Sequence, residues 1–345
     1  MTANSRPRLA DLGIGPGPFP RGELNAITDV AGVEIGHATI AGHEINSGVT
    51  AIVPRQLSAE RRTLPAGLAV GNGYGKLIGA TQIQELGSIE TPILLTSTLS
   101  AFRAADALVT EVLAQPWHVS TTTLNPVVGE TNDGFLSHIR DRPVTGEHVR
   151  AALAAATSGP VAEGAVGAGA GTTALGFKGG IGTASRVVAV GSRSVTVGVL
   201  VQSNFTGLLR IAGVPMPSAE LVPGPTAETI GNSCMIVVAL DAPFDGRQLS
   251  RIARRAVIGM RGVGADFSNG SGDYAIAFTT GAGESLADDD CSGLFHATML
   301  AVEEALINSI LRAETRTGPE GRVAHGIPVD AVRERLERAG ATGLE

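Results

Sequence analysis

The feature that most constrains this chain is the unbroken apolar run CMIVVAL, Cys234–Leu240. A run of this length without a polar face is typical of a strand that is buried on both sides. Such a strand needs other layers of the protein above and below it. The run therefore predicts that a sheet lies in the interior of a layered fold.

Short apolar segments punctuated by glycine predict further strands, with helices between them. Strands are expected at Ile27–Ile35, Val49–Val53, Leu68–Val70, Ile93–Leu95, Val187–Val190, Ser194–Gln202 and Tyr274–Thr279. Helices are expected at Ser100–Gln115, Thr145–Thr157, Leu294–Ala313 and Val329–Arg338, and from an Asp245 cap to about Met260. Met216–Asn232 is rich in proline and predicts an irregular connection. With no repeat period in 345 residues, we expect one α/β (α+β) domain of helices packed on sheets.

Composition excludes several classes of partner. Lys and Arg total 26 against 33 Asp and Glu, the only lysines are Lys76 and Lys178, and no basic stripe suits nucleic acid. No uninterrupted apolar stretch approaches the ~20 residues of a membrane span, so no membrane partner is expected. Met1–Pro20 lacks the apolar region of a secretory signal. Cys234 and Cys291 lie in separate apolar segments, which predicts buried thiols in a cytoplasmic protein.

Metal and cofactor motifs are missing from the sequence. The seven histidines form no HxH or HExxH pair and there is no CxxC, so no metal site and no cofactor are expected. The glycine-rich stretch Gly164–Gly182 contains Gly167, Gly169 and Gly171 but lacks GxGxxG and GK[ST]. Its glycines are better explained by backbones that cross closely. A nucleotide-binding oxidoreductase that uses this stretch is kept as the alternative from a different class.

The remaining candidate is Gly231-Asn232-Ser233, a polar stretch directly before the apolar run. One interpretation is an ordinary turn, in which Asn and Ser are common. The other is a scissile bond: the Ser233 hydroxyl attacks the preceding carbonyl, and water cleaves the resulting ester into fragments 1–232 and 233–345. Ser233 would then carry an α-amine with a reference pKa of ~7.7–8.0, which can act as general base for its own hydroxyl. No catalytic histidine is then needed.

An ordered series of blocks along nearly the whole chain resembles the L-aminopeptidase/D-amidase/D-esterase family, which also includes the β-peptidyl aminopeptidases. Each block alone is weakly specific, but the series in this order is highly specific. The blocks are LNAITDVAGVEIGH (Leu24–His37), GVTAIVPR (Gly48–Arg55), GNGYG (Gly71–Gly75), VVGETNDGF (Val127–Phe135), GPVAEGAVGAGAG (Gly159–Gly171), FKGGIGTASR (Phe177–Arg186), VQSNF (Val201–Phe205), GNSCMIVVALDAPF (Gly231–Phe244), LSRIARRAVIG (Leu249–Gly259) and NGSGD (Asn269–Asp273).

The resemblance implies an αββα four-layer sandwich, layered like the N-terminal-nucleophile hydrolases but connected differently. By position, Ser233 matches the nucleophile that self-cleavage exposes, and Asn204 matches the amide of the oxyanion hole. Ser271 and Asp273 match the pair that orients the amine and hydroxyl of the nucleophile. Glu130 matches the carboxylate that receives the free ammonium of the substrate. The family also implies a homo-oligomer, with a homotetramer of cleaved protomers expected.

Two positions depart from the pattern of some members. Asn132 stands where they have a tyrosine that helps to hold the oxyanion, and Phe135 nearby offers no hydroxyl. Asn132 can still donate a hydrogen bond, so it is counted with Glu130 among the substrate-binding residues. The bond Asn232–Ser233 stands where other members have Gly-Ser.

The expected function is that of a cofactor-free aminopeptidase or amidase for short peptides, amino-acid amides or esters with a free amine. An ω-amino-acid oligomer hydrolase of the same chemistry is the alternative. Self-cleaving ornithine acetyltransferases use a threonine nucleophile, and Ser233 counts against them. A non-enzymatic binding protein would require the loss of Ser233, Asn204 or Asp273, and all three are present.

Overall fold

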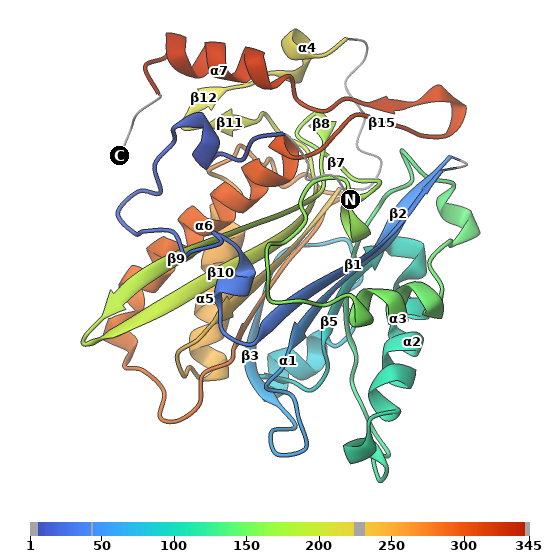
Figure 1. Ribbon diagram of the computed structural model, residues 1–345, viewed down its shortest axis with the longest axis vertical. Coiled ribbons are helices and arrows are strands. Elements are labelled where there is room, and N and C mark those ends of the chain that lie inside the picture. Colours follow the sequence, from blue (N-terminus) through green and yellow to red (C-terminus); the bar gives the residue numbers. More distant parts are fainter. Residues whose placement is uncertain (1–5, 43, 224–231, 342–345) are drawn as a thin grey trace.

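The computed structural model describes residues 6–42, 44–223 and 232–341. Two β-sheets stack face to face, and helices cover the outer face of each (Figure 1). The expected αββα four-layer sandwich is confirmed. Gly231 and the rest of the segment 224–231, which precedes the predicted cleavage position, lie outside the described residues.

The larger sheet has six strands in the order β4-β3-β14-β13-β10-β9. Its neighbours are antiparallel except for β13 and β14, which are parallel. The helices α5 (Gly246–Gly259) and α6 (Cys291–Leu311) cover its outer face. In the order of the sheet, the strands are β4 (Ser88–Ile89), β3 (Leu64–Gly73), β14 (Gly272–Thr279), β13 (Ser233–Leu240), β10 (Arg193–Asn204) and β9 (Ile181–Val190).

The smaller sheet has four strands in the order β1-β2-β5-β6. Strands β5 and β6 are parallel, and the other pairs are antiparallel. The helices α2 (Ala101–Leu113) and α3 (Gly146–Ala154) cover its outer face. Its strands are β1 (Val33–Gly42), β2 (Ile45–Pro54), β5 (Ile93–Ser97) and β6 (Val127–Thr131).

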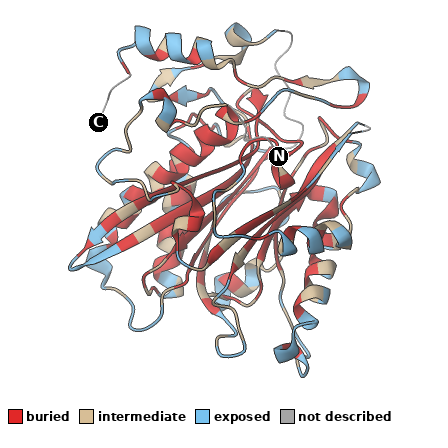
Figure 2. Ribbon diagram, in the orientation of Figure 1, coloured by how far each residue is buried: buried red, intermediate tan, exposed pale blue. Residues whose placement is uncertain are grey.

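Strand β13 shows why the apolar run must be central. All of its residues are buried, and successive side chains point to opposite faces of the sheet. Cys234 and Ile236 belong to the core beneath α5 and α6, whereas Met235 and Val237 belong to the core between the two sheets. The expected burial on both faces is confirmed, and Figure 2 shows buried strands inside and exposed residues on the outer faces of the helices.

Helix α5 begins at the Asp245 cap, as expected, whereas α6, expected from Leu294, begins at Cys291. Asp245 caps α5 because its carboxylate accepts the Gln248 N–H at 2.7 Å, while the Gln248 side chain accepts the Asp245 N–H.

Helix α6 belongs to a segment, Asp288–Leu311, that is long and apolar enough to cross a membrane. In this protein, 78% of its apolar window is buried inside the fold. Both cysteines are buried and free, as expected.

Short elements surround the sandwich. The helices are α1 (Ala80–Leu86), α4 (Ser218–Leu221) and α7 (Val329–Arg338). In Figure 1 most of the short hairpins, with α4 and α7, gather at one end of the molecule, uppermost in the view. The hairpins pair β7 (Thr173–Ala174) with β8 (Phe177–Lys178), β11 (Arg210–Ile211) with β12 (Val214–Pro215), and β15 (Arg316–Thr317) with β16 (Val323–Ala324).

Two predicted elements need correction. The strand expected at Ile27–Ile35 begins only at Val33, because Asp29 closes a 3-10 turn by accepting the backbone N–H of Leu24 and Ala26. The connection Met216–Asn232 is not wholly irregular, since the single helical turn α4 lies within it. In both places local hydrogen bonding decides the backbone, and apolar periodicity does not report it.

The glycine-rich stretch is confirmed as a place of close backbone contacts. A Cβ on Gly169 would lie 2.5 Å from the backbone nitrogen of Ile181, and one on Gly171 would lie 2.0 Å from the carbonyl oxygen of Asn46. Gly167 has a φ of +50° and would clash with Thr50 Oγ1. These glycines are required because no side chain fits between the segments.

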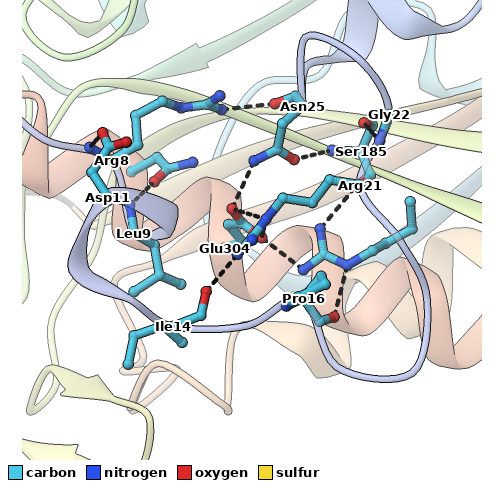
Figure 3. A network of polar contacts seen from close by, with 12 residues as sticks. Arg8, Leu9, Asp11, Ile14, Pro16, Arg21, Gly22, Asn25, Ser185 and Glu304 are labelled. Carbon is cyan, nitrogen blue, oxygen red and sulfur yellow. Dashed lines mark hydrogen bonds and ion pairs between the residues drawn. The ribbon is translucent and has the colours of Figure 1, made fainter. Parts of the chain in front are cut away.

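A buried polar cluster around Glu304 ties the N-terminal segment to α6 (Figure 3). One Glu304 oxygen accepts from Arg21 and from the Asn25 amide at 2.9 and 2.7 Å. The other accepts from Arg186 at 2.7 Å. Leu9 adds a backbone hydrogen bond to Asn308 Oδ1 at 2.8 Å. The extended N-terminal segment is therefore fixed along α6 by charge-assisted hydrogen bonds.

Candidate active site

All four predicted catalytic residues lie at or next to the end of β10 and the starts of β13 and β14, which are neighbours in the larger sheet. In the larger sheet, Asn204 at the end of β10 pairs with Ser233 at the start of β13, and Ser233 pairs with Gly272 at the start of β14. Ser271 and Asp273 flank Gly272 in the chain. Sheet register thus brings together residues from sequence positions 204, 233 and 271–273.

The Asn232–Ser233 peptide bond lies directly against the Ser233 hydroxyl. Ser233 Oγ donates to the carbonyl oxygen of Asn232 at 2.5 Å, and Ser233 is buried. The Gly272 N–H donates to the same carbonyl oxygen at 3.0 Å. The carbonyl is therefore polarised by a backbone donor and has the hydroxyl of the following residue within contact distance. The hydroxyl and the carbonyl that an intramolecular acyl shift from nitrogen to oxygen would use are therefore adjacent.

Asp273 and Ser271 form a buried pair beside Ser233. Ser271 Oγ donates to Asp273 Oδ1 at 2.8 Å, whereas Asp273 Oδ2 has no hydrogen-bond partner among the described residues. Burial raises the pKa of Asp273 to about 6, and the hydrogen bond from Ser271 opposes that rise. A carboxyl group with a pKa near neutrality can change its protonation state during a reaction at physiological pH.

Asn204 is oriented by a hydrogen bond from the backbone. Its side-chain oxygen accepts the Thr173 N–H at 3.0 Å, which makes the NH2 group the donating end of the amide. Thr173 belongs to β7, whose partner strand β8 ends at Lys178. The buried Lys178 Nζ donates to the carbonyls of Gly169 and Gly179 at 2.9 and 2.8 Å, and burial lowers the pKa of this side chain well below its ordinary value. Lys178 thus fixes the base of the hairpin that orients Asn204.

Glu130 reaches the site from the smaller sheet, at the end of β6. It is 3% exposed, and its carboxylate accepts the Lys76 N–H at 2.8 Å. A Cβ on Gly75 would lie 3.3 Å from Glu130 Oε1 and 3.2 Å from Gly272 Cα, so only the width of a glycine separates Glu130 from β14. Burial raises the pKa of Glu130. The hydrogen bond from the Lys76 N–H and the positive charge of the Lys76 side chain oppose that rise. A buried, electron-rich oxygen at this position suits a cationic ligand.

Asn132 lies in the loop that follows β6 and is only partly buried. Its side-chain oxygen accepts the Gly134 N–H at 2.8 Å, which is an Asx turn. Asn132, and not Glu130, therefore holds the turn through Gly134. This contact makes Asn132 in part a structural residue, and its role toward the substrate stays a prediction.

Sequence reasoning missed several residues of this region. Lys76 Nζ lies 3.7 Å from Glu130 Oε1 and donates to Thr98 Oγ1 at 2.9 Å. Tyr274 donates its hydroxyl to the Gly75 carbonyl at 3.1 Å. Gln202 joins the two sheets, since its Nε2 donates to Thr131 Oγ1 at 2.8 Å. Two sequence features could have indicated these residues: lysine occurs only twice in the chain, and Gln202 lies two residues before Asn204.

The described residues contain no group of three or more His, Cys, Asp or Glu side chains placed to hold a metal ion. The polar groups of the site are instead hydroxyls, amides and two carboxylates gathered at adjacent strand ends. Such a set serves nucleophilic attack on a carbonyl, with donors for the oxyanion and a carboxylate for a cation.

Comparison with known proteins gives this arrangement a family. The model of peptidase family S58 matches residues 25–324. The chain belongs to peptidase family S58. The β-peptidyl aminopeptidase BapA of Sphingosinicella microcystinivorans is 38% identical, over 96% of this chain and 92% of that protein.

Solved structures of similar proteins share the S58 fold seen here. The PH0078 protein of Pyrococcus horikoshii OT3 is 41% identical, with a TM-score of 0.90 over 97% of this chain and 99% of that one. The L-aminopeptidase D-ala-esterase/amidase of Ochrobactrum anthropi is 36% identical, with a TM-score of 0.89 over the same shares. It is described as a prototype of the serine aminopeptidases and as a new variant of the Ntn hydrolase fold.

Membership in S58 establishes the type of enzyme. The protein is a serine hydrolase of the N-terminal-nucleophile type, with aminopeptidase or amidase activity. The alternative of a nucleotide-binding oxidoreductase is not favoured, in agreement with the structural role of the glycine-rich stretch. The expected resemblance to the aminopeptidase family is confirmed.

Proposed function

We propose that this protein activates itself by cleaving the Asn232–Ser233 bond and then hydrolyses short peptides, amides or esters that carry a free amine. The observation that carries the proposal is the contact of Ser233 Oγ with the carbonyl of Asn232, which also accepts the Gly272 N–H. The Gly272 contact is the first ladder hydrogen bond of the parallel pair β13–β14. The contact of Ser233 Oγ is not part of that ladder and is directed at the same peptide bond.

In the proposed mechanism of turnover, the new α-amine of Ser233 takes the proton of its own hydroxyl as Oγ attacks the substrate carbonyl. The Asn204 NH2 donates to the developing oxyanion. Ser271 and Asp273 orient the amine. The amine then returns the proton to the leaving group, and water hydrolyses the ester on Ser233.

Glu130 supplies the selectivity for a free amine in this proposal. Its carboxylate is buried beside the start of β14, where an ammonium group gains more from a charged partner than it would in water. The relatives' names point to β-peptides, L-amino-acid derivatives and D-alanine esters or amides as the substrate range to test first. Turnover of ω-amino-acid oligomers in preference to these would favour the alternative substrate class.

We also propose a cytoplasmic homotetramer of cleaved protomers. The two free buried cysteines are compatible with a reducing compartment, and the family resemblance supports the assembly. Light scattering at micromolar concentration should give the mass of four protomers. A monomer would contradict this part of the proposal.

The substitution Glu130→Gln tests the proposed ammonium site. Loss of a charge-assisted hydrogen bond typically costs ~1.5–3 kcal/mol, so kcat/KM for an amino-acid p-nitroanilide should fall by roughly one to two decades. The variant should still cleave itself, since no free amine takes part in that step. N-acylated substrates are the control, because they should be poor for the wild type and insensitive to the substitution. A cleaved variant with full activity would remove Glu130 from the site.

A further inference from the structure

We propose that Thr206, Ser268 and Asp266 form a clamp that positions Asn232 for self-cleavage and has no role in later turnover. The proposal rests on the self-cleavage proposed above. It assigns a positioning role to three residues outside the predicted catalytic set. The clamp acts on Asn232, which contributes the carbonyl group of the scissile bond, and not on the nucleophile Ser233.

The clamp is visible as a connected set of hydrogen bonds. The Asn232 amide nitrogen donates to Thr206 Oγ1 at 3.0 Å and to Ser268 Oγ at 2.5 Å. Thr206 Oγ1 donates to Asp266 Oδ1 at 2.8 Å, and the Ser268 N–H donates to the same oxygen at 3.1 Å. Because the single Thr206 proton is directed to Asp266, the Thr206 oxygen is left as an acceptor for Asn232.

The clamp has rigid supports on both sides of Ser233. Thr206 lies two residues after the end of β10, and Asp266 and Ser268 lie in the loop before β14. These are the strands on either side of β13 in the sheet. The Asp266 N–H also donates to the Thr206 carbonyl at 3.3 Å, which joins the two supports. The Asn232 side chain is therefore held from two directions.

Holding this side chain fixes the carbonyl that Ser233 must attack. The Asn232 carbonyl oxygen faces the Gly272 N–H at 3.0 Å, which is placed to stabilise the negative charge of the tetrahedral intermediate. The bond from Oγ to the carbonyl carbon forms, the carbon–nitrogen bond breaks, and the hydroxyl proton passes to the leaving nitrogen. Water then hydrolyses the ester, which restores the Ser233 hydroxyl and leaves a carboxylate on Asn232.

The clamp is used once because of what cleavage changes. After cleavage Asn232 is the last residue of the first fragment, so its side chain no longer positions a bond that Ser233 attacks. In the proposed turnover, the Asn204 amide is the side chain that donates to the oxyanion. The structure therefore separates the requirements of the first reaction from those of the later ones.

The test measures two rates on the same full-length variants. Cell-free synthesis followed by denaturing gels gives the rate at which the 345-residue chain is converted to fragments. The peptidase kcat/KM is then measured per cleaved molecule with an amino-acid p-nitroanilide. Thr206→Val and Ser268→Ala should each slow self-cleavage about five- to ten-fold, the effect of one lost hydrogen bond. The kcat/KM should change less than about two-fold.

Thr206→Ser keeps the hydroxyl and should restore the wild-type cleavage rate. Thr110→Val removes an exposed hydroxyl on α2, which donates to the Asp106 carbonyl, and should change neither rate. Cleavage of Thr206→Val and Ser268→Ala at the wild-type rate would overturn the clamp, as would an equal loss in both rates. A wild-type chain that never cleaves would instead refute the proposed self-cleavage itself.

Discussion

Two buried polar clusters in this protein differ in how completely their acceptors are paired. Both oxygens of Glu304 accept hydrogen bonds, from Arg21, Arg186 and Asn25. Around Ser233, by contrast, Asp273 Oδ2 and Asn232 Oδ1 are buried without a partner among the described residues. An unpaired buried acceptor costs stability, so the cluster at Ser233 is the less stabilising of the two.

The two clusters also differ in the parts of the chain that they connect. Arg21, Asn25 and Arg186 precede the proposed cleavage position, and Glu304 follows it. The Glu304 cluster therefore links the two proposed fragments through charge-assisted hydrogen bonds. The cluster at Ser233 contains the bond that separates them. One cluster stabilises the assembly of fragments, and the other performs the chemistry.

The largest expected effect comes from Asp273→Asn. Asp273 orients the α-amine of Ser233, which is the proposed general base, and loss of general-base catalysis typically costs 10²–10⁴-fold, so turnover should fall by at least about a hundred-fold. Stability should be unchanged or higher at pH 7.5, because burial opposes the ionised form of Asp273. Stability is measured in the Ser233→Ala background, where every chain stays whole. A large loss of stability there would make Asp273 a structural residue.

Glu304→Gln should show the opposite pattern. The substitution leaves Arg186, which is 3% exposed on its side chain, beside a neutral amide, and breaking a buried ion pair in this way costs about 3–5 kcal/mol. Chemical denaturation of the Ser233→Ala chain with and without Glu304→Gln measures that loss. The kcat/KM per folded and cleaved molecule should stay within about two-fold of the wild type. Equal stabilities of the two chains would contradict the assignment of this cluster to assembly.

A smaller effect concerns pH. Because the pKa of Asp273 is raised to about 6, its carboxyl is protonated below that pH and loses the charge that orients the amine of Ser233, so turnover should slow as the pH falls through about 6. Stability has the opposite sign: the folded-state pKa exceeds the ordinary value of 3.8, so native stability decreases as the pH rises through this window. Asp133 and Glu163 have similarly raised pKa values and share the trend. The difference between chains with and without Asp273→Asn isolates the contribution of Asp273, and identical pH profiles would refute it.

Much of the fold follows from sequence patterns that report burial. The run Cys234–Leu240 and the helix signals at Asp245 and Val329 give elements whose bounds agree closely with the structure. These patterns work because side-chain periodicity and capping are local properties of the chain. The family resemblance added the four layers, which periodicity alone does not specify.

The sequence is less informative about contacts made between distant segments. The cluster at Glu304 depends on partners up to 283 residues away, which no local pattern announces. For the same reason Lys76, which contacts Glu130, and Thr206, which contacts Asn232, were not predicted. The turn at Asp29 is local, but it is made by side-chain hydrogen bonds that apolar periodicity does not report. Ser233, Asn204 and Asp273 were predicted by position in the family's blocks, and the register of three strands explains why such distant residues meet.

The central claim is that Ser233 becomes the N-terminal residue of its own fragment, and intact mass measurement with N-terminal sequencing tests it most directly. The wild-type protein should yield a fragment of 232 residues and one of 345 − 232 = 113 residues that begins Ser-Cys-Met. The two should co-elute under native conditions, and Ser233→Ala should remain whole and inactive. A wild-type enzyme that is active as a single species of 35.1 kDa would contradict the account.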